Sequence, residues 1–285
     1  MRSGWHARGL RGIASILKLA VAPIVVSGVT ACVSPGNVSL SNAWLAGSSV
    51  SDAGDFQFRS VLLADDKQGP LIVVIEGDGA AWQPSGHPPP DPTPRRAVGL
   101  AIAQELSGIA PVLYLARPCQ FLERVQSCSP LYWTRKRFAP EVLRAYKTQI
   151  EANSRGRRVV FVGYSGGGVI AAELALSHPS TSGLLTLAAP LDLERWTGHF
   201  DVSPLESPSG AALLQRLVAA PWPQQHFFGG RDRIVPRQVS ADIIARLGRD
   251  QAALIEGATH SGPWDTVAAL AVTPIAGTEG QTTSP

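Results

Sequence analysis

The sequence predicts an α/β fold in which a mostly parallel central sheet is flanked by helices. Short apolar runs, typical of strands, alternate along the chain with stretches of helical periodicity. Two of the runs, LIVVI at 71–75 and RVVFV at 158–162, are almost entirely apolar, as strands covered on both faces are. Strands that alternate with helices imply right-handed crossovers, and these produce a parallel sheet.

The expected elements follow one another through a single domain at 56–273. Strands are expected at 56–63, 71–75, 112–115, 158–162, 183–187, 225–228 and 252–255, and helices at 96–106, 140–153, 167–177, 237–247 and 264–271. The irregular stretch 189–223 is expected to form a short cap, and the tail 274–285 is expected to be disordered. Ligands of such folds bind where parallel strands end, so the residues that follow strands are the candidates for a site.

The first 31 residues have the pattern of an export signal. Basic residues lie between Arg2 and Lys18, and an apolar run of 11 residues, Leu19–Val29, follows them. That run is too short to span a bilayer and suits a secretory signal. The segment VTAC, which ends at Cys32, resembles the lipobox of bacterial lipoproteins. The resemblance implies cleavage before Cys32 and lipidation of its thiol and new amino group, and several acyl chains together give stable anchoring.

The residues after the cysteine bear on where the protein is held. The segment 32–55 is rich in Ser, Gly and Asn and is expected to be a tether. Val33 stands where Asp would be the alternative sorting signal. By resemblance to lipoprotein sorting in enteric bacteria, this favours the periplasmic face of the outer membrane, so the expected partner is the membrane, through Cys32. An ordinary signal peptide with a chance cysteine and an uncleaved anchor are the alternatives.

The charge of the chain argues against nucleic-acid binding. The chain has 25 Lys and Arg and 22 Asp and Glu, a net charge of +3. Four of the basic residues and no acidic residue lie in the first 31 positions, so the remainder has 21 basic and 22 acidic residues and a net charge of −1. A nearly neutral surface attracts a polyanion weakly, so no nucleic-acid partner is expected. The oligomeric state does not follow from the sequence.

Two cysteines remain once Cys32 is assigned to a lipid anchor. Cys119 and Cys128 lie nine positions apart, and an oxidising compartment favours their pairing. Such a short loop contributes about 2–3 kcal/mol by restricting the unfolded chain. The alternative is a pair of buried free thiols. Neither cysteine has the Cys-x-x-Cys spacing of a zinc site, so no metal is expected.

The segment GYSGG at 163–167 carries the first candidate for catalysis. It directly follows the run 158–162 and leads into a helical pattern, so G-x-S-x-G occurs in the strand–turn–helix context of a nucleophile elbow. The turn strains the serine backbone and brings the residues two before and two after it together, which requires small side chains. A glycine-rich turn or a phosphate-binding loop is the alternative, but a Walker lysine is absent. Ser165 is therefore the expected nucleophile.

A nucleophilic serine needs a base and an acid that orients the base. His260 follows the last expected strand, where this topology places the base. Asp232 follows the expected strand at 225–228 and gives the chain order Ser, Asp, His. Asp192, which follows the expected strand at 183–187, is the second candidate for the acid. The other histidines are weaker candidates for the base, because they include one in the leader, one in an expected strand and one at the end of an expected helix.

These motifs and their order resemble those of the α/β-hydrolase superfamily over most of 56–273. The resemblance implies an α/β-hydrolase fold and nucleophilic catalysis by a Ser-His-Asp triad. The segments RPCQ at 117–120 and DPTP at 91–94 also resemble a group of exported bacterial α/β hydrolases.

The same resemblance implies an oxyanion hole made of backbone N–H groups. One donor is Gly166, directly after the nucleophile, and the other comes from EGDG at 76–79. In relatives with a His-Gly-x pattern the residue after the first glycine donates, which here is Asp78. Because Glu76 replaces the histidine, Gly79 remains an alternative. Asp78 also adds a carboxylate. It is either an ordinary turn residue or a residue that disfavours anionic substrates or holds a cationic group.

The expected reaction is a two-step acyl transfer to water from a small or medium ester, with no cofactor and no metal. Amidase, peptidase and thioesterase chemistry uses the same residues and stays open. A binding lipoprotein that kept the fold without activity is the alternative from another class. Trp82, Trp196 and Trp264 lie near the ends of expected strands, where they line a substrate pocket or anchor the core.

Overall fold

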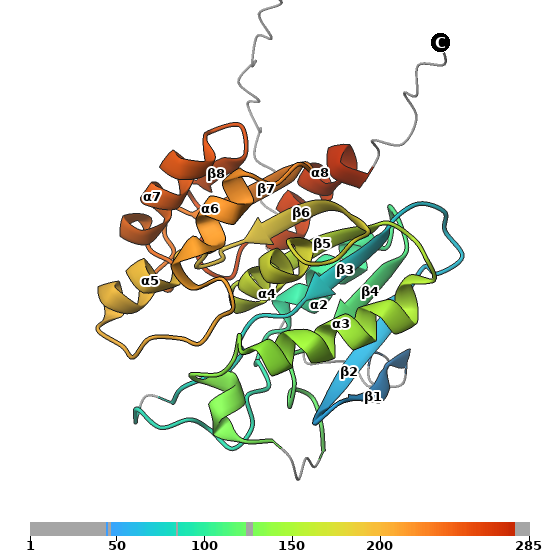
Figure 1. Cartoon of the computed structure of the whole chain (residues 1–285), viewed down its shortest axis with the longest axis horizontal. Coiled ribbons are helices and arrows are strands. Elements are labelled where there is room, and N and C mark those ends of the chain that lie inside the picture. Colours follow the sequence, from blue (N-terminus) through green and yellow to red (C-terminus); the bar gives the residue numbers. More distant parts are fainter. Residues whose placement is uncertain (1–43, 45–46, 84, 124–127, 277–285) are drawn as a thin grey trace, which may run out of the picture. The chain divides into compact units, whose positions relative to one another are not determined.

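The computed structural model describes residues 44, 47–83, 85–123 and 128–276. Eight strands form one sheet in the order β1-β2-β4-β3-β5-β6-β7-β8 (Figure 1). They are β1 (Ser49–Ala53), β2 (Phe56–Leu63), β3 (Leu71–Ile75), β4 (Val112–Leu115), β5 (Val159–Tyr164), β6 (Thr181–Leu187), β7 (Gln224–Gly229) and β8 (Ala252–Ile255). Strand β2 is antiparallel to both of its neighbours, and all the other pairings are parallel.

Helices cover both faces of this sheet. Helices α2 (Val98–Leu106) and α8 (Trp264–Ala276) pack on one face, and α3 (Pro140–Ser154), α4 (Gly166–Ala175), α6 (Leu213–Val218) and α7 (Arg237–Leu247) pack on the other. Successive side chains of β3 therefore point into different cores. Leu71, Val73 and Ile75 belong to the core beneath α3 and α4, whereas Ile72 and Val74 belong to the core beneath α2 and α8. A strand between two cores has no polar face, which explains the apolar run.

The predicted fold class is confirmed, and each expected strand and helix is present with shifts of a few residues at its ends. The predicted tether is wrong for its last part, because Ser49–Ala53 forms β1. This strand is mostly polar, so hydrophobicity does not reveal it, and its pairing with β2 in a hairpin supplies its hydrogen bonds. Trp44 is also buried, and its ring lies edge-on to Tyr114 and Phe121.

Two further segments differ from expectation. The stretch 189–223 contains α5 (Leu193–Phe200), a short 3-10 turn (Gly210–Ala212) and α6. Helix α8 continues through Pro274 to Ala276, beyond the expected start of the tail. Its last turn is held because Ile275 packs so closely on Gly183 that a Cβ at that glycine would lie 2.1 Å from the isoleucine side chain. The rest of the expected tail, the export signal and Cys32 lie outside the described residues.

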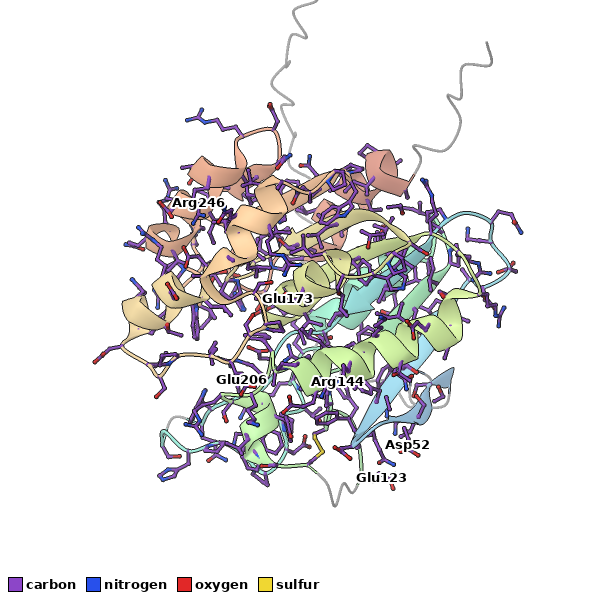
Figure 2. The ribbon with its side chains drawn as sticks, viewed as in Figure 1. Asp52, Glu123, Arg144, Glu173, Glu206 and Arg246 are labelled. Atoms are coloured by element: carbon purple, nitrogen blue, oxygen red, sulfur yellow. A yellow bond between two sulfur atoms is a disulfide. The ribbon has the colours of Figure 1, made fainter. Side chains whose placement is uncertain are left out.

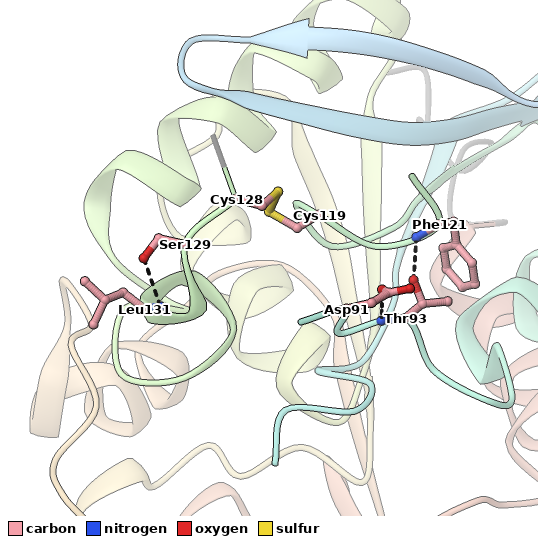
Figure 3. The surroundings of a disulfide bond; sticks show 7 residues. All are labelled: Asp91, Thr93, Cys119, Phe121, Cys128, Ser129 and Leu131. Carbon is pink, nitrogen blue, oxygen red and sulfur yellow. Dashed lines mark hydrogen bonds between the residues drawn. A yellow bond between two sulfur atoms is a disulfide. The ribbon is translucent and has the colours of Figure 1, made fainter. Parts of the chain in front are cut away.

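A disulfide joins Cys119 to Cys128, with 5.8 Å between their Cα atoms (Figure 3). It closes the loop that follows β4, next to a segment in which Thr93 Oγ1 accepts a hydrogen bond from the N–H of Phe121. The expected pairing of the two cysteines is therefore present. None of the helices in the described ranges is long and apolar enough to cross a membrane.

Candidate active site

The serine of the G-x-S-x-G segment lies in a strained turn between β5 and α4. Ser165 has φ 52° and ψ −126°, a conformation that side chains with a Cβ rarely adopt. A Cβ on Gly163 would lie 2.4 Å from the carbonyl oxygen of Gly167, and one on Gly167 would lie 2.4 Å from the carbonyl oxygen of Glu76. Both flanking glycines are therefore required by close approach of backbone, as expected for a nucleophile elbow.

A continuous series of hydrogen bonds links the serine to a histidine and an aspartate. Ser165 Oγ lies 3.0 Å from His260 Nε2, and His260 Nδ1 lies 2.8 Å from Asp232 Oδ2. The other carboxylate oxygen of Asp232 accepts hydrogen bonds from the N–H groups of Ile234 and Val235, at 2.7 and 2.9 Å. Since the buried carboxylate accepts from Nδ1–H, Nε2 carries the lone pair and is positioned to accept the serine proton.

The loop that carries His260 is fixed by two donors that bind its backbone. Tyr164 Oη donates to the carbonyl oxygen of His260 at 3.0 Å, and Trp264 Nε1 donates to the same oxygen at 2.7 Å. Burial raises the pKa of the Tyr164 hydroxyl well above its ordinary value, so this group stays a neutral donor. This role of Tyr164 was not predicted from the sequence, although the residue occupies the variable position of G-x-S-x-G.

The structure places Asp232, and not Asp192, beside the imidazole. Asp192 instead caps α5, where its Oδ1 accepts the N–H of Arg195 at 3.0 Å. The histidine that lies within β7, His226, is fully buried and bonded to Thr186 and Gln224. Over the described ranges, no group of three or more His, Cys, Asp and Glu side chains is arranged to hold a metal ion.

Backbone N–H groups of the two expected oxyanion donors lie unused beside the serine. Within the part of the chain that the structure describes, neither the N–H of Gly166 nor that of Asp78 donates to a protein acceptor. The two residues touch, because a Cβ on Gly166 would lie 2.1 Å from Asp78 Oδ1. Gly79, at φ 68°, faces Pro92 and Gln120 instead. This arrangement favours Asp78 over Gly79 as the second donor.

Glu76, the first residue after β3, ties the loop that follows this strand to the start of α2. Its carboxylate is buried and accepts hydrogen bonds from the N–H groups of Gly77, Gly99 and Leu100 and from the hydroxyl of Tyr114, at 2.9 to 3.2 Å. It thus satisfies helix N–H groups that no side chain of α2 caps. Burial raises the pKa of Glu76, against the opposing effect of these four donors.

Two arginines that the sequence analysis did not assign to the site hold the side chain of Asp78. Arg117 Nη1 lies 3.0 Å from Asp78 Oδ1, and Arg137 Nη1 lies 3.1 Å from Asp78 Oδ2. Gln120 supports the same loop, since its Nε2 donates to the carbonyl oxygen of Gly77 at 3.0 Å. Asp78 therefore holds cationic groups, which is one of the two expectations for its carboxylate, and these groups belong to the chain itself.

The segment between β6 and β7 lies over this cluster and is attached at two places. Trp196 of α5 donates from Nε1 to the carbonyl oxygen of Ile234 at 2.7 Å, and its ring lies 5.6 Å from the Arg137 guanidinium carbon. Glu173 of α4, which is labelled in Figure 2, accepts hydrogen bonds from the hydroxyls of Ser207 and Ser209, at 2.7 and 2.6 Å. The segment is therefore tied both to the loop that carries Asp232 and to the helix that follows Ser165.

The three tryptophans considered from the sequence have different surroundings. Trp264 is 1% exposed and anchors the core at the start of α8, whereas Trp82 is 55% exposed. Trp196 is partly buried and contacts Arg137. Of the three, only Trp196 lies against the charged cluster beside the serine.

Comparison with known proteins bears on the fold. No protein-family model and no curated protein sequence matches the chain. An α-β serine hydrolase homologue from Coxiella burnetii matches with a TM-score of 0.55 at 15% identity, over 80% of this chain and 97% of that one. Est1E from Butyrivibrio proteoclasticus matches with a TM-score of 0.55 at 14% identity, over 80% and 98%. The esterase domain of a Rhodothermus marinus protein matches with a TM-score of 0.51 at 14% identity, over 78% and 92%.

At such low sequence identity, these matches show the fold of the chain and do not show its activity. The alignments extend over almost the whole of each solved structure. The chain has the α/β-hydrolase fold.

Proposed function

We propose that the protein is a serine hydrolase that cleaves an ester-type bond of a small or medium acyl substrate through an acyl-enzyme. The observation that carries this proposal is the series of hydrogen bonds from Ser165 Oγ through His260 to the buried Asp232, at the carboxyl ends of the parallel strands. The similar solved structures include a serine hydrolase homologue and esterases, which is in line with this chemistry.

Each atom of the site has a defined part in the proposed reaction. His260 Nε2 takes the proton as Ser165 Oγ attacks the carbonyl carbon, and Asp232 stabilises the imidazolium without becoming protonated. The N–H groups of Gly166 and Asp78 bind the oxyanion of the tetrahedral intermediate. His260 then gives its proton to the leaving alkoxide, and the acyl-enzyme forms. Water, activated by His260, attacks this ester, and release of the acid restores the free serine.

Labelling with a fluorophosphonate probe tests the nucleophile. We expect the mature protein to be labelled at Ser165, and the Ser165→Ala variant to remain unlabelled, because the probe reacts only with an activated serine. Ser177→Ala, which removes an exposed hydroxyl just beyond α4, is the matched control and should label like the wild type. Absence of label on the wild-type protein would support a non-catalytic binding protein instead. A panel of esters, thioesters and amides then identifies the bond that is cleaved.

We further propose that the chain is exported and anchored through lipid on Cys32, at the periplasmic face of the outer membrane. The support is the basic start, the short apolar run and the lipobox-like VTAC of the sequence. Cys32→Ser should abolish both membrane association and the mobility shift of the processed form on gels. Unchanged fractionation and size would contradict lipidation.

A further inference from the structure

A charged cluster with an excess of positive charge lies beside the proposed oxyanion hole. Asp78 takes one guanidinium on each carboxylate oxygen, from Arg117 and from Arg137, at 3.0 and 3.1 Å. The side chains of the two arginines are only 4% and 6% exposed. One carboxylate facing two guanidinium groups leaves a formal charge of +1. A buried charge without a counter-ion is unfavourable, so this cluster lacks an anion.

The hydrogen-bonding capacity of the cluster is also incomplete. Arg117 Nη2 donates to the backbone carbonyl oxygen of Arg137 at 2.6 Å. Arg137 itself makes no side-chain hydrogen bond within the described residues beyond its ion pair with Asp78, and its Nε is buried without a partner. Its Nη1 is engaged by Asp78, and its Nη2 has no hydrogen-bond acceptor among the described residues. Unused donors on a buried arginine are therefore available at the site.

The cluster lies next to the turn that carries the proposed nucleophile. The Asp78 carboxylate touches Gly166, the residue after the proposed nucleophile. Arg137 is bound to the far side of this contact through the Asp78 carboxylate, and its guanidinium carbon lies 5.6 Å from the ring centres of Phe138 and of Trp196. Trp196 belongs to α5, which overlies the site. The charged cluster thus extends from Gly166, directly after Ser165, to Trp196 of α5.

We propose that Arg137, supported by Arg117 and Asp78, is an anion-binding subsite, and that the preferred substrates carry a carboxylate near the ester that is cleaved. This inference rests on the proposed function. A guanidinium group presents paired N–H donors that match the two oxygens of a carboxylate, and a cluster of charge +1 is neutralised by one such group. The carboxylate belongs either to the acyl part or to the leaving alcohol.

Two matched substrate pairs test the proposal. In the first pair, 4-nitrophenyl hydrogen adipate is compared with the 4-nitrophenyl ester of adipamic acid, so that only the acyl part changes charge. In the second, 4-acetoxybenzoate is compared with 4-acetoxybenzamide, so that only the alcohol changes. We expect kcat/KM to favour the anionic member of one pair by about 10- to 100-fold, the range for one hydrogen bond to a charged group. The pair that shows the preference identifies the side that carries the carboxylate.

Variants then assign the preference to the cluster. Arg137→Met should bring the anionic-to-neutral ratio of kcat/KM close to one, whereas Arg137→Lys should retain part of it. Arg135→Met removes an exposed positive charge two residues away and should leave the ratio unchanged. Equal rates within both pairs for the wild type, or a ratio that survives Arg137→Met, would overturn the subsite.

The subsite can still be tested if a variant does not fold, and its failure can be distinguished from failure of the proposed function. Should Arg137→Met fail to fold, protection of wild-type Ser165 from the fluorophosphonate probe by adipate, but not by adipamide, supports the subsite, and equal protection contradicts it. Hydrolysis of the neutral esters without a charge preference defeats the subsite and leaves the proposed function standing. Lack of both labelling and hydrolysis defeats the proposed function, and the subsite with it.

Discussion

At the scale of single residues, the two carboxylate oxygens of Asp232 have different roles. Oδ1 accepts two backbone N–H groups of its own loop, so the carboxylate cannot rotate. Oδ2 is thereby held toward His260 Nδ1 at 2.8 Å. The orientation of the imidazole, and the location of the lone pair that Ser165 needs, both depend on this division.

Asp232→Asn should lower kcat by about 10⁴-fold with little change in stability. The amide oxygen takes over the place of Oδ1, because the backbone N–H groups require an acceptor there. The amide NH₂ then faces His260 Nδ1, which must become the acceptor, and Nε2 carries a proton and cannot accept one from Ser165. Steady-state kinetics on the ester found by the panel measures the loss.

Asp192→Asn is the matched control for this change. Asparagine caps a helix about as well as aspartate does, so α5 should stay intact and kcat should remain within about twofold of the wild type. A larger loss from Asp192→Asn than from Asp232→Asn would mean that the acid has been misassigned.

Residues with requirements local in sequence were predictable. Gly163, Ser165 and Gly167 form one turn whose crowding and strain demand these residue types in this order. Arg137 was not predictable, because its partner Asp78 lies far away in sequence and no local pattern records an ion pair. For the same reason, the hydrogen bonds by which Glu76 joins two segments were not predictable, and the sequence indicated only that Glu76 replaces an expected histidine.

At the scale of elements, Glu76 joins the loop after β3 to α2. All four groups that its carboxylate contacts are donors. A neutral amide therefore cannot replace it without setting a donor against a backbone N–H. Because Gly77 is among the four and Asp78 follows it, the same contacts hold the proposed oxyanion loop in place.

Glu76→Gln should lower the free energy of unfolding by about 1–3 kcal/mol, the cost of a buried donor left without an acceptor. It should also lower kcat more than it changes KM, since the oxyanion loop loses its support while substrate contacts remain. Urea unfolding and steady-state kinetics measure the two effects. Glu105→Gln, at an exposed position of α2, should have neither effect. Equal behaviour of the two variants would assign Glu76 no positioning role.

The disulfide stabilises a second loop of the site. Cys119 lies between Arg117, which holds Asp78, and Gln120, which holds the carbonyl oxygen of Gly77. Closing this short loop restricts the unfolded chain, an effect of about 2–3 kcal/mol. The double variant Cys119→Ser/Cys128→Ser should lose that amount in urea unfolding and lose part of kcat. Treatment with a reducing agent should reproduce both losses in the wild type and leave the double variant unaffected. An unchanged free energy of unfolding of the wild type after its disulfide is reduced would contradict this prediction.

Elements with a strong pattern were predictable, and elements held mainly by partners were not. The run LIVVI of β3 reflects burial between two cores, so the sequence alone identifies the strand. Strand β1 is polar and exists by pairing with β2. Helix α5 and the segment after it depend on attachments to Ile234 and Glu173, which no window of local sequence contains.

At the scale of the whole molecule, the sheet order brings distant residues to one edge. The residues Asp78, Ser165, Asp232 and His260 follow β3, β5, β7 and β8, whose parallel direction places their carboxyl ends together. The alternation of strands and helices predicted that edge. It did not predict which strands are neighbours, because strand order depends on packing across the entire sheet. Chain order alone therefore did not reveal that the β4 loop, with Arg117, reaches the same place.

The stability of the whole molecule should depend on pH through His226, a buried histidine of β7, the strand next to the edge strand β8. Its Nδ1 lies 2.8 Å from Thr186 Oγ1 and its Nε2 lies 2.9 Å from Gln224 Oε1, which suits the neutral ring. Burial lowers the pKa of His226 from 6.5 to about 3. Below pH 6.5 the unfolded chain therefore binds a proton that the folded protein refuses, and stability falls as the pH falls toward 3.

Each pH unit in this window should remove up to about 1.4 kcal/mol from the free energy of unfolding through this one group. Urea unfolding of the wild type at pH 7, 6, 5 and 4 measures the slope, to which titrating carboxylates also contribute. His226→Asn should be less stable at pH 7 and should show a shallower slope, because the titrating ring is gone. His199→Asn removes an exposed histidine and should keep the wild-type slope. Parallel slopes for the wild type and His226→Asn would show that His226 does not resist protonation in the fold, since only a group with different proton affinities in the two states contributes to this dependence.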